Sequence, residues 1–383
     1  MRFVARFSGF IAFAVALTPG WSDDAVVFAT GGTARLMRPH ASIRMVREEV
    51  RIKLYPDRAE VDCTFVFKNE GKATTVQIGF PETLQEGTDT SAQTAPTLRN
   101  FRAYLDGKPV SYRILKASER RGEYGIAYWY VRTVHFAAGQ QRTTRVTYSA
   151  ELGYDSGGRN LFQYVLHTGA SWKGSIGYGR IVIDERSLLP DYAVENIHDN
   201  GQFRRQGNLL VWEFRELEPT NEHDLFISIA PRNTLSLHIR SSSSPGELTE
   251  SYLPYTWQGE PTVIVRNGVL YAQWDALAEA LGLTPRTHWQ WNPSQKRLRV
   301  VVGGRTLVAR PNETRVSVNQ QVHGLQSPLL YQRAVYKEPR LWVPVREFLK
   351  LLGYEVQIER SVSKETSAIN YKVIVSQAIN QVN

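Results

Sequence analysis

Apolar and polar residues alternate along residues 43–80 with the period of two that is typical of β-strands. Turn residues at Pro56-Asp57 and Asn69-Glu70-Gly71 divide this stretch into three runs. The apolar positions of the runs are Val50, Ile52 and Leu54, then Val61, Cys63, Phe65 and Phe67, then Val76, Ile78 and Phe80. The pattern predicts an antiparallel meander.

Further strands are expected along the chain as far as residue 235, where no convincing helix of ten residues occurs after residue 40. Asp106-Gly107 predicts a hairpin between two of these strands. The other expected strands are 124–136, 143–152, 177–185, 208–217 and 224–230. Many short strands separated by turns favour a β-sandwich, either one or two stacked, with a barrel as the alternative.

A second pattern appears after residue 260, where LYAQWDALAEALG at 270–282 is repeated as LWVPVREFLKLLG at 341–353. Each copy reads as a strand followed by a helix, expected at 274–281 and 345–352, that stops at a glycine. Each helix is followed by a hydrophobic hairpin, and Gly303-Gly304 marks the turn in the first copy. One unit cannot bury its helix face alone, so we expect two packed units with one interior.

These patterns predict a mainly β fold with an N-terminal β-sandwich and a C-terminal α+β module of two strand-helix-hairpin repeats. The expected divisions are a signal peptide at 1–22, a sandwich domain at 23–240, a serine-rich linker at 241–252 and the duplicated module at 253–383. No later stretch is apolar enough for a transmembrane segment in the mature chain. The single cysteine, Cys63, is expected in the core, which suits a bacterial protein exported to the periplasm or cell surface.

Charge is distributed unevenly between the two parts. Residues 23–252 hold 28 Lys and Arg against 28 Asp and Glu, whereas residues 253–383 hold 16 against 9. Successive side chains of a strand point to opposite faces, so if Leu298 and Val300 face inward, Arg297 and Arg299 should face outward. We therefore expect a polymer-binding surface made of Arg297, Arg299, Arg305 and Arg310 with the rings of Trp289 and Trp291, and a second exposed ring and ammonium group at Trp172 and Lys173.

The repeated motif, with its Val343-Pro344-Val345-Arg346 start and Asn292-Pro293 turn, resembles the stalk-type domain named for the N-terminal region of copper amine oxidases. In that family, copper and the tyrosine-derived quinone belong to a separate catalytic domain, so the resemblance implies no copper and no cofactor here. Residues 23–235 are similar to an uncharacterised family of secreted bacterial proteins, which implies an extracytoplasmic location and no particular chemistry.

Other candidate sites lack supporting residues. Ser156 lies in an Asp-Ser-Gly-Gly segment but has no histidine motif to activate it. Two His-Asp pairs, His198-Asp199 and His223-Asp224, could each offer only one side chain to a common site, because neighbours on a strand face opposite ways. We therefore expect no catalytic residue and no metal site.

The sequence thus predicts a non-catalytic exported protein that binds anionic wall or polysaccharide polymers of the cell envelope through its basic C-terminal module. Other envelope proteins are a further class of partner, and nucleic acid is not expected because no recognition motif is present. Two alternatives remain: a scaffold of a surface assembly, or a glycan hydrolase using paired carboxylates of the sandwich. The candidate carboxylates are Glu48, Glu49, Asp184 and Glu185.

Overall fold

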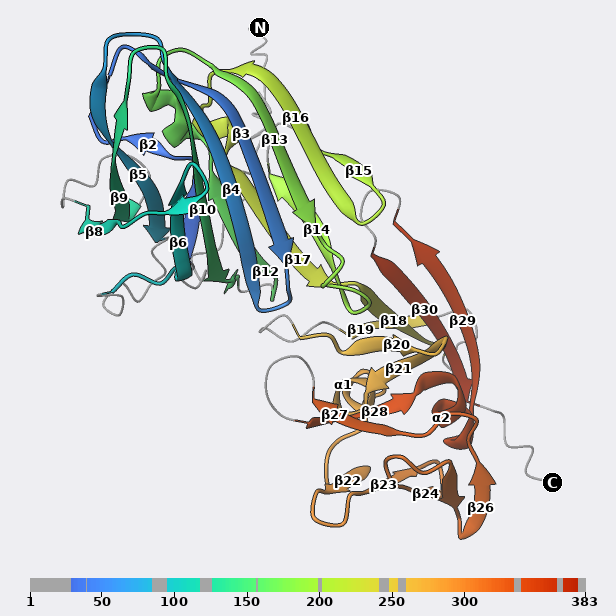
Figure 1. Cartoon of the computed structure of the whole chain (residues 1–383). Coiled ribbons are helices and arrows are strands. Elements are labelled where there is room, and N and C mark those ends of the chain that lie inside the picture. The colour runs from blue at the N-terminus through green and yellow to red at the C-terminus, as the bar shows by residue number, and fades with distance from the viewer. Residues whose placement is uncertain are drawn as a thin grey trace, which may run out of the picture.

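The chain folds into an N-terminal β-sandwich and a smaller C-terminal module (Figure 1). The computed structural model describes residues 29–38, 40–84, 95–117, 126–155, 158–198, 202–240, 248–253, 260–333, 339–363 and 368–377. Strands dominate these residues, as the sequence pattern predicted. No helix within them is long and apolar enough to cross a membrane. The predicted signal peptide lies outside the described residues.

Two sheets form the sandwich. The nine-stranded sheet contains β1 (Ala29–Gly32), β2 (Arg35–Leu36), β5 (Thr74–Leu84), β8 (Arg113–Lys116), β9 (Ile126–Phe136), β11 (Gly153–Tyr154), β12 (Asn160–Val165), β14 (Tyr192–His198) and β17 (Leu225–Pro231). The eight-stranded sheet contains β3 (Ile43–Leu54), β4 (Arg58–Asn69), β6 (Arg99–Leu105), β7 (Lys108–Pro109), β10 (Gln141–Glu151), β13 (Ile176–Asp184), β15 (Arg204–Gln206) and β16 (Leu209–Leu217). Two short 3₁₀ helices, His167–Ser171 and Asn221–His223, lie between strands.

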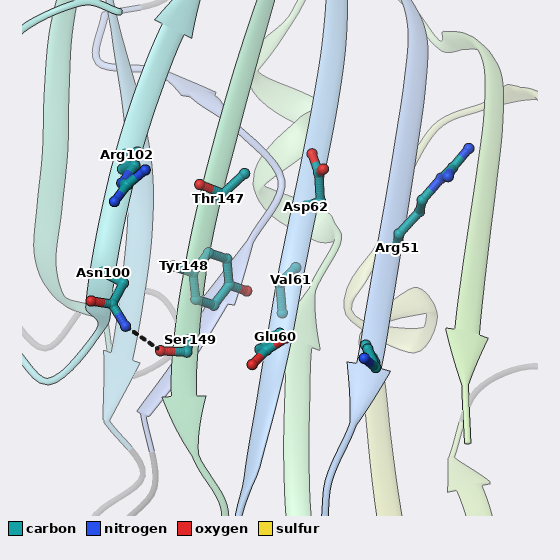
Figure 2. A pocket seen from close by; sticks show the side chains of 10 residues that line it. Arg51, Glu60, Val61, Asp62, Asn100, Arg102, Thr147, Tyr148 and Ser149 are labelled. Carbon is teal, nitrogen blue, oxygen red and sulfur yellow. Dashed lines mark hydrogen bonds between the residues drawn. The ribbon is translucent and has the colours of Figure 1, made fainter. Parts of the chain in front are cut away.

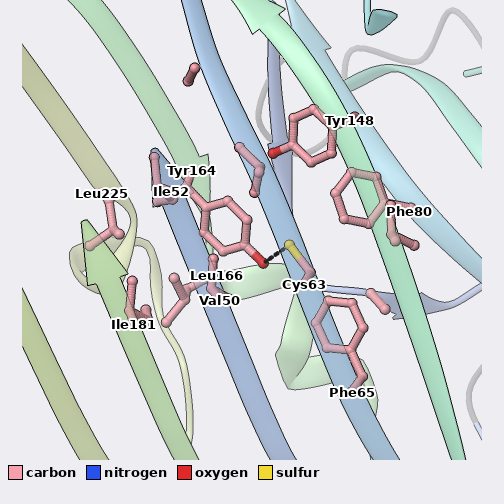
Figure 3. Packing of buried hydrophobic residues seen from close by; sticks show 14 of the residues in the cluster. Val50, Ile52, Cys63, Phe65, Phe80, Tyr148, Tyr164, Leu166, Ile181 and Leu225 are labelled. Atoms are coloured by element: carbon pink, nitrogen blue, oxygen red, sulfur yellow. Dashed lines mark hydrogen bonds between the residues drawn. The ribbon is translucent and has the colours of Figure 1, made fainter. Parts of the chain in front are cut away.

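The predicted three-stranded meander is wrong in its third strand. β3 and β4 form a long antiparallel hairpin, but β5 crosses to the other sheet and pairs with β9. The crossing places Phe80 of β5 against Tyr148 of β10, with ring centroids 5.3 Å apart, inside the sandwich. Figure 3 shows this core, in which Cys63 is fully buried as predicted, its Sγ 3.5 Å from the hydroxyl of Tyr164.

The aromatic strand β9 contributes to the same core. Tyr130 and Phe136 belong to the buried cluster, so these two rings fill part of the interior. At the hairpin between β6 and β7, Asp106 and Gly107 have positive φ angles of 47° and 79°. Both angles suit a tight type I′ turn, which is why the Asp-Gly pair marked this hairpin in the sequence.

A carboxyl group is buried among these apolar side chains. A register shift between Met45 and Arg47 turns Glu48 of β3 toward the interior, where it is fully buried. Its Oε1 accepts hydrogen bonds from the hydroxyls of Thr33, at 2.6 Å, and Tyr164, at 3.3 Å. Among the described residues its Oε2 has no hydrogen-bond partner. Burial raises the pKa of Glu48 to about 7, against the two hydrogen bonds, which lower it.

The C-terminal module consists of three small sheets and two α-helices. One sheet contains β18 (Asn233–Arg240), β19 (Leu248–Leu253), β29 (Tyr354–Val362) and β30 (Ile369–Gln377). The second sheet contains β20 (Val263–Arg266), β21 (Val269–Gln273), β27 (Leu330–Arg333) and β28 (Pro339–Pro344). The third sheet contains β22 (Trp289–Asn292), β23 (Arg297–Val302), β24 (Arg305–Ala309), β25 (Arg315–Val318) and β26 (Gln321–Gly324). The helices are α1 (Trp274–Ala280) and α2 (Val345–Leu351), close to the predicted spans.

The two repeats pair with each other around a local pseudo-twofold axis. Ala272 of β21 lies opposite Val343 of β28, and these residues are 71 positions apart and equivalent in the repeat. On one side of them Tyr271 lies opposite Pro344, and on the other side Gln273 lies opposite Trp342, the equivalent of Tyr271. The pair Tyr271–Pro344 is thus equivalent to the pair Trp342–Gln273 with the two strands interchanged, as a twofold relation requires.

Both helices pack into one core, as expected for a duplicated unit. The rings of Trp274 of α1 and Phe348 of α2 are 5.3 Å apart, and both are buried in a cluster that also contains Leu298 and Val373 from the two hairpins. Gly282 and Gly353 follow the C-cap residues of α1 and α2, with φ of 72° and 95°. These left-handed conformations confirm the predicted glycine stops.

Strand pairing places the boundary between the two parts before the predicted linker. β18, expected in the sandwich domain, pairs with β19 and β30 of the C-terminal module. Residues 248–252 of the expected linker belong to β19, and the serine run at 241–247 lies outside the described residues. The parts also meet through Arg266 of β20, which donates two hydrogen bonds to Asp191, at 2.7 and 2.6 Å.

The Glu48→Gln variant tests the buried carboxyl. Since the pKa of Glu48 rises from 4.5 to about 7 on folding, its full contribution to stability is present below pH 4.5 and is lost as pH rises through about 7. The free energy of unfolding should fall by about 3 kcal/mol over this range. Urea unfolding of Glu48→Gln should show a smaller fall, whereas the outward-facing Glu49→Gln should behave like the parent. Parallel pH profiles for Glu48→Gln and the parent would refute the assignment.

Candidate functional site

The sheet β22–β26 lies at the end of the molecule farthest from the sandwich (Figure 1). Along β23, Leu298 and Val300 are fully buried, while Arg297 and Arg299 are exposed. This alternation follows from the strand itself, because one face must cover the helices of the module. The prediction that Arg297 and Arg299 face outward is confirmed.

Two further arginines share this outer face. Arg310 follows the buried Ala309, and Arg315 precedes the buried Val316, so strand alternation turns both to the side of Arg299. Continuing the register from Leu298 opposite Ala309 places Arg297 beside Arg310. We refer to Arg297, Arg299, Arg310 and Arg315 as the basic face.

The basic face has almost no acidic neighbours in sequence. Residues 286–324 contain seven Lys and Arg and one acidic residue, Glu313. Within the described part of the chain, none of the four arginines has an ion pair with a carboxylate. Their positive field is therefore not cancelled locally, and it favours the approach of a polyanion.

Arg305 does not belong to this face, contrary to the prediction. It pairs with Val302 and points toward the core side of the sheet, where its Nη1 donates to the Leu351 carbonyl at 3.4 Å. A Cβ on Gly353 would come within 3.0 Å of the Arg305 Nε. The guanidinium thus lies at the C-terminus of α2, where the helix carbonyls attract a positive charge.

The two tryptophans also face the other way. Trp289 lies opposite Val300, and Trp291 lies opposite Leu298, on the inner side of β22. The Trp289 ring packs edge to face on Trp274 at 6.0 Å, and Trp291 packs on Tyr331 at 5.2 Å. The structure therefore separates these rings from Arg297 and Arg299, which were predicted to act with them.

The expectation of an exposed ring at Trp172 is wrong. Trp172 is buried, its Nε1 donates to the Ala34 carbonyl at 2.6 Å, and its ring lies 4.1 Å from that of Phe67. Lys173 is exposed, but its Nζ forms an ion pair with Glu70 at 2.8 Å. The glycines around this segment suggested a surface loop, whereas the tryptophan fills a gap in the sandwich core.

The carboxylates considered for hydrolysis do not form a pair. Glu48 faces the interior of the sandwich and Glu49 faces outward from the same strand. Asp184 accepts a hydrogen bond from Arg186 Nε at 2.9 Å, and the buried Glu185 forms an ion pair with Arg205. Two carboxyls facing each other across a cleft, as glycoside hydrolysis requires, are not assembled from these four residues.

The histidine candidates take structural positions. His223 bonds through Nδ1 to the Thr220 hydroxyl at 2.9 Å, and Asp224 accepts a hydrogen bond from Nδ1 of His167 at 2.7 Å. Among the described residues no group of three or more His, Cys, Asp or Glu side chains is arranged to hold a metal ion. Ser156 and Asp199 lie outside the described residues.

A second charged surface, which the sequence pattern did not predict, lies on the outer face of the eight-stranded sheet. It contains a depression of about 400 Å³ between β3 and β6 (Figure 2). Its lining includes Arg51, Lys53 and Arg102. The signal was present in the sequence, because the polar positions that alternate with the buried residues of β3 and β4 are mostly charged.

Comparison with known families supports the resemblance seen in the repeats. The sequence model of the copper amine oxidase N-terminal domain matches residues 254–364. This range covers both helices and the sheet β22–β26. No protein of curated function matches the sequence.

Several solved structures are similar to parts of the chain. A protein of Legionella pneumophila described as a candidate nutrient binding protein is 21% identical, with a TM-score of 0.45, over 54% of this chain and 72% of that one. An M1 zinc metallopeptidase of Deinococcus radiodurans is 9% identical, with a TM-score of 0.27, over 60% and 51%. Leukotriene A4 hydrolase of Saccharomyces cerevisiae is 12% identical, with a TM-score of 0.28, over 53% and 32%. Similarities this distant carry no argument about function.

Glutamine substitutions distinguish Arg305 from the basic face. Arg305→Gln removes a charge that interacts with the end of α2, and should lower the free energy of unfolding by about 1 kcal/mol. Arg299→Gln removes an exposed charge that forms no ion pair with the described residues, and should change the free energy of unfolding by less than about 0.5 kcal/mol. Urea unfolding of both variants measures the difference. Equal stabilities would contradict the role given to Arg305.

Proposed function

We propose that this is a non-catalytic exported protein that attaches to anionic polymers of the cell envelope through its C-terminal module. The observation that carries the proposal is the basic face: four exposed arginines on one side of a small sheet, which form no ion pair with the described residues. The match to an amine oxidase N-terminal domain supports an accessory role, because copper chemistry in those enzymes belongs to a separate domain.

The chemistry of the basic face suits a repeating polyanion better than a single small anion. The arginines lie on three neighbouring strands, β23 to β25 and their ends, so the charge is spread over the sheet rather than gathered in a cavity. With Trp289 and Trp291 turned inward, binding rests on charge and hydrogen bonds. Such binding should weaken strongly with salt, because exposed charges are screened.

A co-sedimentation experiment with purified bacterial cell walls tests the proposal. The full chain should be retained at about 50 mM salt and released at about 500 mM. A variant in which Arg297, Arg299, Arg310 and Arg315 are all changed to Gln should lose about tenfold in affinity at the lower salt, since four charge-assisted contacts are removed.

The matched control changes the same number of exposed arginines elsewhere. Its four positions, also changed to Gln, are Arg113, Arg204, Arg215 and Arg360. This control has the same net charge as the basic-face variant, so it should keep the wall binding if position matters. Equal losses in the two variants would show that net charge alone drives retention, and equal retention by all proteins would overturn the proposal.

A further inference from the structure

The N-terminal sandwich has nearly equal numbers of basic and acidic residues, but charged residues are not spread evenly over the outer faces of its two sheets. Outward positions on the central strands of the eight-stranded sheet carry many charges: Arg47, Glu49, Arg51, Lys53, Arg58, Glu60, Asp62, Arg102 and Arg145. The outward positions of β5 and β9 in the other sheet, such as Gln77 and Thr133, carry no Lys, Arg, Asp or Glu. Charged outward positions are therefore denser on the central strands of the eight-stranded sheet than on β5 and β9.

The depression on this face is built from two rows of side chains that cross the strands. Register places Asp62 between Arg51 and Thr147, with Arg102 beyond Thr147. The second row, two residues along the strands, contains Lys53, Glu60 and Ser149. Asn100 borders this row and donates from Nδ2 to the Ser149 hydroxyl at 3.4 Å. Figure 2 shows Arg51 and Arg102 at opposite sides, with the smaller polar groups between them.

Both carboxylates of the depression are already neutralised by arginines outside its lining. Asp62 accepts two hydrogen bonds from Arg145, at 2.8 and 2.6 Å. Glu60 accepts hydrogen bonds from Arg58, at 3.3 and 3.4 Å, and from the hydroxyl of Tyr55 at 3.1 Å. These contacts hold both carboxylates in place as acceptors and reduce their repulsion of an anion.

The cations at the two sides remain available. Within the described residues the side chains of Arg51 and Arg102 form no hydrogen bond and no ion pair, and both residues are exposed. The Lys53 ammonium lies 4.9 Å from the centre of the Tyr55 ring, and Lys53 is exposed. The depression therefore presents positive charge at its rims and hydroxyl groups in its floor.

The spacing of the cations selects the kind of ligand. Arg51 and Arg102 stand on strands three places apart, which is about 14 Å. That separation is too wide for both guanidinium groups to bind one carboxylate or phosphate, but it suits two negative groups along a chain. The floor has no exposed aromatic ring, because Tyr148 is buried beneath it, so recognition depends on hydrogen bonds to hydroxyl groups rather than on stacking.

We infer that this depression binds a segment of a carboxylated polysaccharide. Arg51 and Arg102 each engage a sugar carboxylate, while Thr147, Ser149 and the fixed carboxylates of Asp62 and Glu60 hydrogen-bond the sugar hydroxyls. This site is separate from the basic face, and the inference does not require the proposed wall attachment. It would give the chain two binding sites, one on the sandwich and one on the C-terminal module.

Isothermal titration of the full chain tests the inference, in a background where the four basic-face arginines are changed to Gln. A hexamer of galacturonic acid should bind, whereas its methyl-esterified form and inorganic phosphate should not. Adding Arg51→Gln and Arg102→Gln should weaken binding of the hexamer by about tenfold or more. Adding Arg204→Gln and Arg215→Gln instead, on the same sheet but outside the depression, should leave binding within about twofold.

Three outcomes would overturn the inference. They are hexamer binding that both double variants weaken equally, binding of the methyl ester with the affinity of the acid, and no binding of the acid hexamer. Failure of this site is distinguishable from failure of wall attachment, because the titration is carried out without the basic face. If the parent is retained by cell walls but the hexamer does not bind, the inferred polysaccharide site in the depression is refuted and the proposed wall attachment still stands.

Discussion

The antiparallel pairing of β21 with β28 is the constraint on which the C-terminal module depends. Each repeat carries one short helix with one apolar face, and a seven-residue helix is not stable in water by itself. Pairing the two strands at Ala272 and Val343 brings Trp274 and Phe348 into contact and gives both helices a common core. Duplication thus supplies the second half of an interior that a single unit lacks.

That core also decides which side chains the module can offer to a partner. Because the inner face of β22–β26 must cover the helices, Trp289 and Trp291 turn inward and leave the outer face to arginine. Arg305 lies on the inner side, where its guanidinium donates a hydrogen bond to the Leu351 carbonyl at the end of α2. An outer surface with arginines and without tryptophan rings follows directly from how the repeats pack.

The sandwich and the module are joined by more than chain continuity. β18 leaves the sandwich after β17 and becomes a central strand of a module sheet, with β19 on one side and β30 on the other. Arg266 of the module and Asp191 of the sandwich also form an ion pair that contains two hydrogen bonds. The sandwich and the module are therefore connected by strand pairing and by a side-chain contact as well as by the chain.

The sequence by itself determined what depends on neighbours a few residues away. The period-two strands, the spans of α1 and α2, the glycine stops at Gly282 and Gly353 and the Asp106-Gly107 turn all follow from local periodicity and backbone geometry. Tertiary structure alone decided the crossing of β5, the transfer of β18 to the module, the burial of Trp172 and the position of Arg305. These features depend on which distant strand or helix end supplies the partner, and local pattern does not encode that choice.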